Sequence, residues 1–123
     1  MATINIKTEG HVLIVTITGD ATAPELISVI KEYYPKADVT DVIWDFTFGS
    51  WQYISQSGFK DVAISAKEAV ARGTRHGSKT AFVGTDGLEF GLHRMYQAIA
   101  EVTGVPVTYN TFKTMEEAQQ WMA

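Results

Sequence analysis

The apolar pattern of the first third of the chain predicts a β-hairpin followed by one helix. Residues 3–7 alternate weakly between polar and apolar side chains, a Glu-Gly turn follows, and residues 12–18 are rich in β-branched side chains. Both segments are typical of strands joined by a short glycine-containing turn. Thr22 and Pro24 then open a segment that ends at Pro35 and carries apolar residues at helical spacing: Leu26, Ile27, Ile30, Tyr33 and Tyr34.

The middle of the chain, residues 42–59, is the stretch around which we expect the fold to be organised. Residues 42–46 form a predicted strand whose alternation places Val42, Trp44 and Phe46 on one face. A loop rich in aromatic residues follows, and from Phe59 onward the sequence has its clearest helical period. The buried stripe of this helix is predicted to contain Phe59, Val62, Ala63, Ala66, Ala69 and Val70.

The last third of the chain predicts two further pairs of strand and helix. Residues 80–84 and 105–109 have strand patterns. Asp86 with Glu89, and Thr114 with Glu117, are predicted to cap the helices that follow these strands. The stripe that we expect to be buried on the first of these helices consists of Leu88, Gly91, Leu92, Met95, Ala98, Ile99 and Val102.

The predicted order, ββαβαβαβα, favours a single α/β domain over residues 1–123. We expect a mixed sheet in which an antiparallel N-terminal hairpin is followed by a parallel run of strand and helix pairs. If successive parallel strands are neighbours, right-handed crossovers place their helices on one side and leave the other side thinly covered. Residues 12–17 are apolar except for Thr16, as in a strand buried on both faces, so a doubly wound sheet is the alternative architecture.

Composition excludes several classes of protein. The chain has 123 residues, no cysteine and a formal net charge of −4, which suits one ordinary globular domain. A mildly acidic surface gives no general attraction for nucleic acid, and the absence of cysteine removes thiolate nucleophiles. The longest apolar run is far shorter than a membrane span, and the N-terminal residues have no signal-peptide pattern. We therefore expect a cytoplasmic protein with no nucleic-acid partner and no membrane insertion.

Several segments together resemble a known bacterial family. They are the strand at residues 13–19, the strand at 42–46 with the Phe48-Gly49-Ser50-Trp51 segment that follows it, and residues 112–121. These segments are similar to the SpoIIAA-like family, which belongs with the STAS domains of anti-anti-sigma factors and sulfate-transporter regulators. That family shares its fold with the lipid-binding Sec14 (CRAL-TRIO) domains. The resemblance covers nearly the whole chain and implies a SpoIIAA/STAS-like fold and a non-catalytic regulatory module that binds a protein partner.

The resemblance also implies a candidate phosphorylation site. In the anti-anti-sigma branch, an acid-Ser-Ser-Gly-aliphatic turn at the start of the second helix presents a serine to a partner kinase. The matching residues are Ser-Gln-Ser-Gly-Phe at 55–59, which place Ser57 at the phosphorylated position, with Ser55 as the runner-up. Here Ser55 replaces the acid, and the preceding loop is longer than in that branch. The alternative is that Ser57 is only the N-cap of this helix, because a cap needs the same residue type.

The loop before this helix is the candidate surface for a partner or a ligand. Its aromatic side chains, with Trp44 and Phe46 of the strand, would suit an apolar pocket for a lipid-like small ligand. They would equally suit an interface with a protein partner, or the core itself. A homodimer through the thinly covered face of the sheet is compatible with each of these. The residues of this candidate surface are Phe48, Gly49, Ser50, Trp51, Tyr53, Gly58 and Phe59.

No motif in the sequence indicates catalysis, a metal or a cofactor. Neither Ser50 nor Ser57 lies in the GxSxG turn of a hydrolase, and the three histidines lack metal-ligand spacing. Glu89 and His93 lie four residues apart on a predicted helix and could pair, but we expect His93, beside Arg94, on a solvated face. The expectation is a protein that is not an enzyme and holds no cofactor or metal.

Overall fold

The computed structural model describes residues 2–36, 40–72, 77–85 and 87–123. Its elements alternate in the predicted order ββαβαβαβα. The strands are β1 (Thr3–Glu9), β2 (Val12–Asp20), β3 (Asp41–Ser50), β4 (Lys79–Val83) and β5 (Thr108–Phe112). The helices are α1 (Ala23–Tyr33), α2 (Gln56–Ala71), α3 (Gly87–Thr103) and α4 (Met115–Met122).

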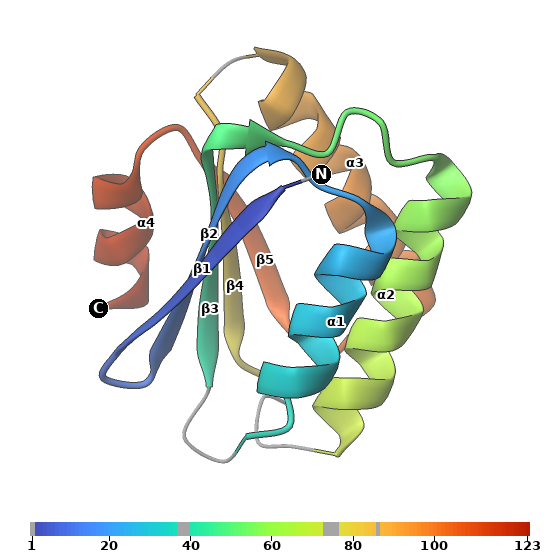
Figure 1. Ribbon diagram of the computed structural model, residues 1–123. Coiled ribbons are helices and arrows are strands. Elements are labelled where there is room, and N and C mark those ends of the chain that lie inside the picture. Colours follow the sequence, from blue (N-terminus) through green and yellow to red (C-terminus); the bar gives the residue numbers. More distant parts are fainter. Residues whose placement is uncertain (1, 37–39, 73–76, 86) are drawn as a thin grey trace.

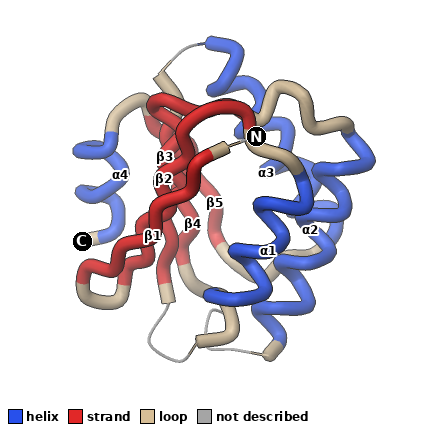
Figure 2. The backbone as a smooth tube through the Cα atoms, viewed as in Figure 1, coloured by secondary structure: helices blue, strands red, loops and turns tan. Residues whose placement is uncertain are grey.

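The strands form one mixed sheet in sequential order, β1-β2-β3-β4-β5. The β1–β2 pair is antiparallel and the other pairs are parallel, so the predicted SpoIIAA/STAS-like arrangement is confirmed and the doubly wound alternative is wrong. Because neighbouring parallel strands are joined by right-handed crossovers, α1, α2 and α3 lie on the same face of the sheet (Figure 1). Figure 2 shows α4 alone on the opposite face.

Two apolar cores lie on the two faces of the sheet. Beneath α1, α2 and α3 the core contains Val42, Trp44 and Phe46, and the whole predicted stripe of α2 is buried there. Ile43 faces the other way and packs with Ala118 of α4. The alternation predicted for β3 is therefore confirmed. β2 is buried on both faces, as its apolar run predicts, with residues 13, 15 and 17 in one core and residue 14 in the other.

The last strand begins three residues later than the sequence pattern indicates. We predicted a strand at residues 105–109, but pairing with β4 starts at Thr108. The preceding residues are used to end α3. Gly104 has a φ of 89°, which favours glycine, and the Val105 N–H donates to the Ala100 carbonyl at 3.1 Å. Pro106 has no N–H to give to a sheet, so the apolar character of this segment serves the helix end and the core.

The buried face of α3 also differs from the prediction. The structure buries Glu89, His93, Tyr96 and Ala100. Of the predicted stripe, Leu92 and Ile99 are partly buried against the core, whereas Leu88, Met95 and Val102 are exposed. The helix is rotated about its axis relative to the apolar pattern. The cause lies at the end of β3 and in the loop after it. There the Ser50 hydroxyl and the Trp51 N–H donate to the Glu89 carboxylate, and the Trp51 ring packs against the Tyr96 ring.

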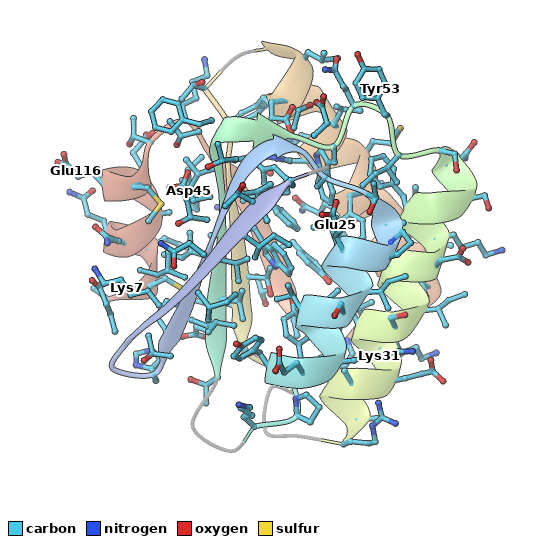
Figure 3. All side chains as sticks on the ribbon, in the orientation of Figure 1. Lys7, Glu25, Lys31, Asp45, Tyr53 and Glu116 are labelled. Atoms are coloured by element: carbon cyan, nitrogen blue, oxygen red, sulfur yellow. The ribbon has the colours of Figure 1, made fainter. Side chains whose placement is uncertain are left out.

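Glu25 joins the start of α1 to the N-terminal strand. Its carboxylate accepts hydrogen bonds from the Thr22 N–H at 2.9 Å, the Thr22 hydroxyl at 3.0 Å and the Ala2 N–H at 3.3 Å. Figure 3 shows Glu25 on α1 beside the start of β1. Burial acts to raise the pKa of Glu25, but the hydrogen bonds from Thr22 and Ala2 outweigh it, and the pKa lies below its ordinary value.

This lowered pKa predicts a contribution to stability that is present at neutral pH and lost at acid pH. The contribution is complete above the unfolded-state pKa of about 4.3 and is lost as the pH falls through the lower folded-state value. We therefore expect the variant Glu25→Gln to lose free energy of unfolding at pH 7 and to approach the wild type near pH 3. Urea unfolding at several pH values measures this, and an equal difference at both pH values would contradict it.

Candidate functional site

The loop between β3 and α2 lies at the carboxyl ends of the parallel strands, where open α/β sheets place their sites. Gly49 and Ser50 form the last residues of β3, and the Ser50 carbonyl accepts a hydrogen bond from the Ala21 N–H at 2.7 Å. A Cβ atom at Gly49 would collide with the Ile17 carbonyl of β2. Glycine is therefore required at this position by the close approach of β2 and β3.

The Glu89 carboxylate of α3 holds the start of this loop in place through hydrogen bonds. The Ser50 hydroxyl donates to Glu89 Oε2 at 2.8 Å, and the Trp51 N–H donates to Glu89 Oε1 at 3.3 Å. The Ser50 Oγ in turn accepts from the Gln52 N–H at 3.0 Å. A single carboxylate of α3 thus holds two consecutive residues of the loop. The predicted capping pair of Asp86 with Glu89 involves Asp86, which lies outside the described residues.

His93 accompanies Glu89 in the interior. Its Nε2 lies 3.5 Å from Glu89 Oε1, and both side chains are buried. The predicted solvated position of His93 is therefore wrong, while the predicted proximity of the two residues is confirmed. Gly84 makes room for them, because a Cβ atom there would lie 2.9 Å from His93 and 3.0 Å from Glu89. The sequence indicated this pair only through the spacing of four residues between Glu89 and His93 on a predicted helix.

Trp51 lies at the centre of an aromatic cluster. Its ring centroid is 4.9 Å from that of Phe59, 5.1 Å from Phe46 and 5.2 Å from Tyr96. The cavity that remains beside these rings has a volume of about 10 Å³, which is room for about one water molecule. The aromatic density of the loop therefore supplies core packing, and no space for a lipid-like ligand lies among these rings.

Two other aromatic residues of the candidate surface, Phe48 of β3 and Tyr53 of the loop, point outward. Phe48 is 77% exposed and Tyr53 is 76% exposed, and Figure 3 shows Tyr53 on the outside of the loop. Aromatic residues are enriched in protein interfaces. The predicted candidate surface therefore divides into a buried part, which includes Trp51 and Phe59, and an exposed rim at Phe48 and Tyr53.

Ser55, rather than Ser57, is the N-cap of α2. The Ser55 Oγ accepts a hydrogen bond from the Gly58 N–H at 3.0 Å, and its extended backbone precedes the first helical residue, Gln56. The predicted capping role of Ser57 is therefore wrong by two residues. The reason is that the helix begins earlier than the Ser-Gly pair indicates, because the Phe59 N–H already donates to the Ser55 carbonyl at 2.9 Å.

Ser57 is therefore not the residue that caps α2. It is the second residue of α2 and is exposed. A shallow hollow of about 320 Å³ beside it is lined by Gln56, Ser57, Lys60 and Ile99. The first turn of α2 has no acidic residue, so the positive end of the helix dipole is not neutralised there. Lys60 and Asp61 follow one turn further on.

The assignment of the cap predicts different costs for two neighbouring alanine substitutions. Ser55→Ala is expected to lower the free energy of unfolding by about 1 kcal/mol, because the Gly58 N–H loses its acceptor. Ser57→Ala is the matched control and is expected to change it by less than about 0.5 kcal/mol. Urea unfolding followed by circular dichroism measures both, and the reverse order of the two costs would assign the cap to Ser57.

Known structures share this fold. An uncharacterised protein of the DUF3478 family from Shewanella loihica PV-4, described as having a SpoIIAA-like fold, is similar over 99% of this chain and 94% of its own, with 14% identity and a TM-score of 0.59. An anti-sigma factor antagonist from Mycobacterium paratuberculosis is similar over the same shares, with 14% identity and a TM-score of 0.66. The chain therefore has the SpoIIAA-like fold, and the predicted resemblance is confirmed at the level of the fold.

Sequence comparison adds no closer assignment. No protein-family model and no curated protein matches the chain. In the described part of the chain, no helix has the length and apolarity needed to cross a membrane, and no group of three or more His, Asp or Glu residues is arranged to hold a metal ion.

Proposed function

We propose that this protein is a non-catalytic, STAS-like regulatory module that binds a protein partner through the exposed rim at Phe48 and Tyr53 together with Ser57 at the start of α2. In this proposal, phosphorylation of Ser57 controls the binding. The observation that carries it is the position of Ser57, which is exposed on the first turn of α2 while Ser55 performs the capping. The similarity in fold to an anti-sigma factor antagonist, a class that acts through protein partners, supports the same interpretation.

The start of α2 is chemically suited to a phosphorylated serine. A helix leaves its first N–H groups outside its own hydrogen-bond ladder, and these groups attract anions. Lys60 lies one turn further along α2 and lines the same hollow as Ser57. A phosphate on Ser57 would add about two negative charges beside Lys60. It would also place that charge on a rim that otherwise offers aromatic rings, and so oppose the burial of this rim by a partner.

The absence of catalysis in this proposal rests on the burial of the reactive groups. Glu89 and His93 form the one acid and histidine pair that lies at the carboxyl end of the sheet within the described residues. Both side chains are buried beneath the loop, and the Glu89 carboxylate is engaged by Ser50 and Trp51. A substrate would have to displace the loop to reach either group, so their role is structural.

The first test is mass spectrometry of the protein purified from its own host. We expect a fraction of the chain to carry the mass of one phosphate, and peptide mapping to place it on Ser57. The variant Ser57→Ala is the control and is expected to lose the modification while remaining folded. A phosphate that maps to Ser55, or a chain that stays unmodified under all growth conditions, would contradict the proposed control.

A further inference from the structure

The outward side of α3 carries a continuous row of apolar side chains. Leu88 is 59% exposed, Met95 is 41% exposed and Val102 is 91% exposed. The exposed small residues Gly91 and Ala98 lie between them, so the row follows alternating steps of three and four residues. This spacing is that of a seam along which two helices pair. α2 separates α3 from α1 in the helical layer, and α3 lies at its end (Figure 1).

The alternation of large and small residues in this row fits an antiparallel copy of itself. A two-fold axis that crosses α3 near Gln97 would set Met95 of one copy against Ala98 of the other, and Val102 against Gly91. Met95 and Val102 would then each meet a small residue, which allows close approach of the two helices. An isologous contact of this kind must be self-complementary, and this row meets that condition.

The surface beside the row is hollowed at the end where such a copy needs space. A shallow groove of about 320 Å³ lies between α2 and α3 and is lined by Lys60, Ala98, Ile99, Val102 and Thr103. The same two-fold axis would bring the protruding Leu88 of the second copy to the end of α3 at Val102 and Thr103. The protruding side chain and the groove therefore lie at opposite ends of one helix, as an antiparallel pair requires.

The charges beside the row are self-complementary as well. Arg94 and Glu101 are both exposed and lie seven residues apart on the same flank of the row. In an antiparallel pair, residues of one flank face the same flank of the other helix. The proposed axis would bring Arg94 of each copy within one helical turn of Glu101 of the other, and so form two opposite-charge pairs. This charge pattern argues for a second copy rather than for an unrelated partner.

We propose that the protein forms a two-fold dimer in which α3 packs antiparallel against α3 of a second copy. This dimer leaves Phe48 and Tyr53 uncovered and does not use the thinly covered sheet face. Its groove adjoins the hollow beside Ser57, because Lys60 and Ile99 line both. A single helix pair buries less than the roughly 800 Å² per partner that is typical of stable complexes. We therefore expect a dissociation constant of roughly 1–100 μM.

Sedimentation velocity over a concentration series tests the dimer. We expect the wild type to pass from monomer to dimer between about 1 μM and about 1 mM. Val102→Lys is expected to remain a monomer, because it places two cations in the apolar contact. Tyr53→Lys, on the proposed partner rim, is the control and should dimerise as the wild type does. A wild type that stays monomeric, as expected if another protein occupies this face, would overturn the proposal.

A charge exchange distinguishes this dimer from any other pairing. Arg94→Glu and Glu101→Arg should each weaken association by roughly tenfold. In the two-fold dimer, each substitution replaces both opposite-charge pairs by pairs of like charge. The double variant Arg94→Glu with Glu101→Arg should restore association to near the wild-type value. Arg94 and Glu101 are both exposed, so folding, checked by circular dichroism, should be unaffected. A dimer that persists in Val102→Lys, or a double variant no tighter than the single ones, would place the interface elsewhere.

Discussion

Replacement of Trp51 by alanine is expected to lower the free energy of unfolding by about 3–5 kcal/mol, the largest effect of any single substitution in the loop. The side chain is buried, and its ring centroid lies within 5.4 Å of five other rings. Removing it would leave a cavity bounded by side chains of β3, β4, α2 and α3, which cannot all move inward. The neighbouring rings are those of Phe46, Phe59, Phe82, His93 and Tyr96.

Urea unfolding followed by far-ultraviolet circular dichroism measures this cost. Trp51→Phe keeps an aromatic ring and is expected to lose roughly half as much stability. Trp121→Ala is the matched control, because Trp121 is only partly buried and lies over Phe112 on the other face of the sheet. A loss of less than about 1 kcal/mol for Trp51→Ala would show that Trp51 is not a core residue.

Replacement of Glu89 by leucine is expected to lower the free energy of unfolding by about 2–4 kcal/mol, although leucine is apolar and the site is buried. The substitution removes the acceptor of the Ser50 hydroxyl and of the Trp51 N–H, and both groups face the interior. An apolar replacement does not compensate for a buried donor that has lost its acceptor. The loop from Ser50 to Ser55 should therefore lose its fixed position before the rest of the fold unfolds.

Hydrogen exchange and urea unfolding together test this role. Glu89→Gln retains one carbonyl oxygen in the same position, so it should lose less stability than Glu89→Leu. Ser50→Ala removes a single donor and should lose about 1 kcal/mol. In Glu89→Leu the Trp51 amide should exchange faster, while amides of β4 should remain protected. Unchanged exchange at Trp51 would mean that Glu89 does not hold the loop.

The fold was predictable where burial and backbone pairing require the same pattern. In β3, Val42, Trp44 and Phe46 alternate with Ile43, and the period of two assigns each side chain to a face without further information. The stripe of α2 behaves in the same way, because one side of that helix meets an entirely apolar surface. Right-handed crossover then determines the side of the sheet on which α1, α2 and α3 lie.

The orientation of α3 was not predictable from its apolar pattern. Glu89 is buried because the Ser50 hydroxyl and the Trp51 N–H, which are distant in sequence, need an acceptor at that point. Such a requirement becomes visible only when β3 and α3 are placed side by side. The apolar row at Leu88, Met95 and Val102 is then left in solvent. We infer that its apolar character serves an interaction outside the single chain.

The identity of the serine that caps α2 was only partly predictable from the sequence. The sequence offers Ser55 and Ser57 within three residues of one another, and either would suit the first turn of a helix. Only the start of the backbone hydrogen-bond ladder separates them, because the Phe59 N–H bonds to the Ser55 carbonyl. That distinction matters for function, since it leaves Ser57 exposed and free to carry a modification.

The most direct test of the central claim is the affinity of the partner for the unmodified and the modified surface. The partner is captured from the host with tagged wild-type protein, identified, and then titrated by calorimetry against wild type, Ser57→Asp and Ser57→Ala. We predict that Ser57→Asp binds at least about tenfold more weakly, which is about 1.4 kcal/mol, while Ser57→Ala binds as the wild type does. Equal affinity of wild type and Ser57→Asp for every recovered partner would contradict the claim that Ser57 controls this surface.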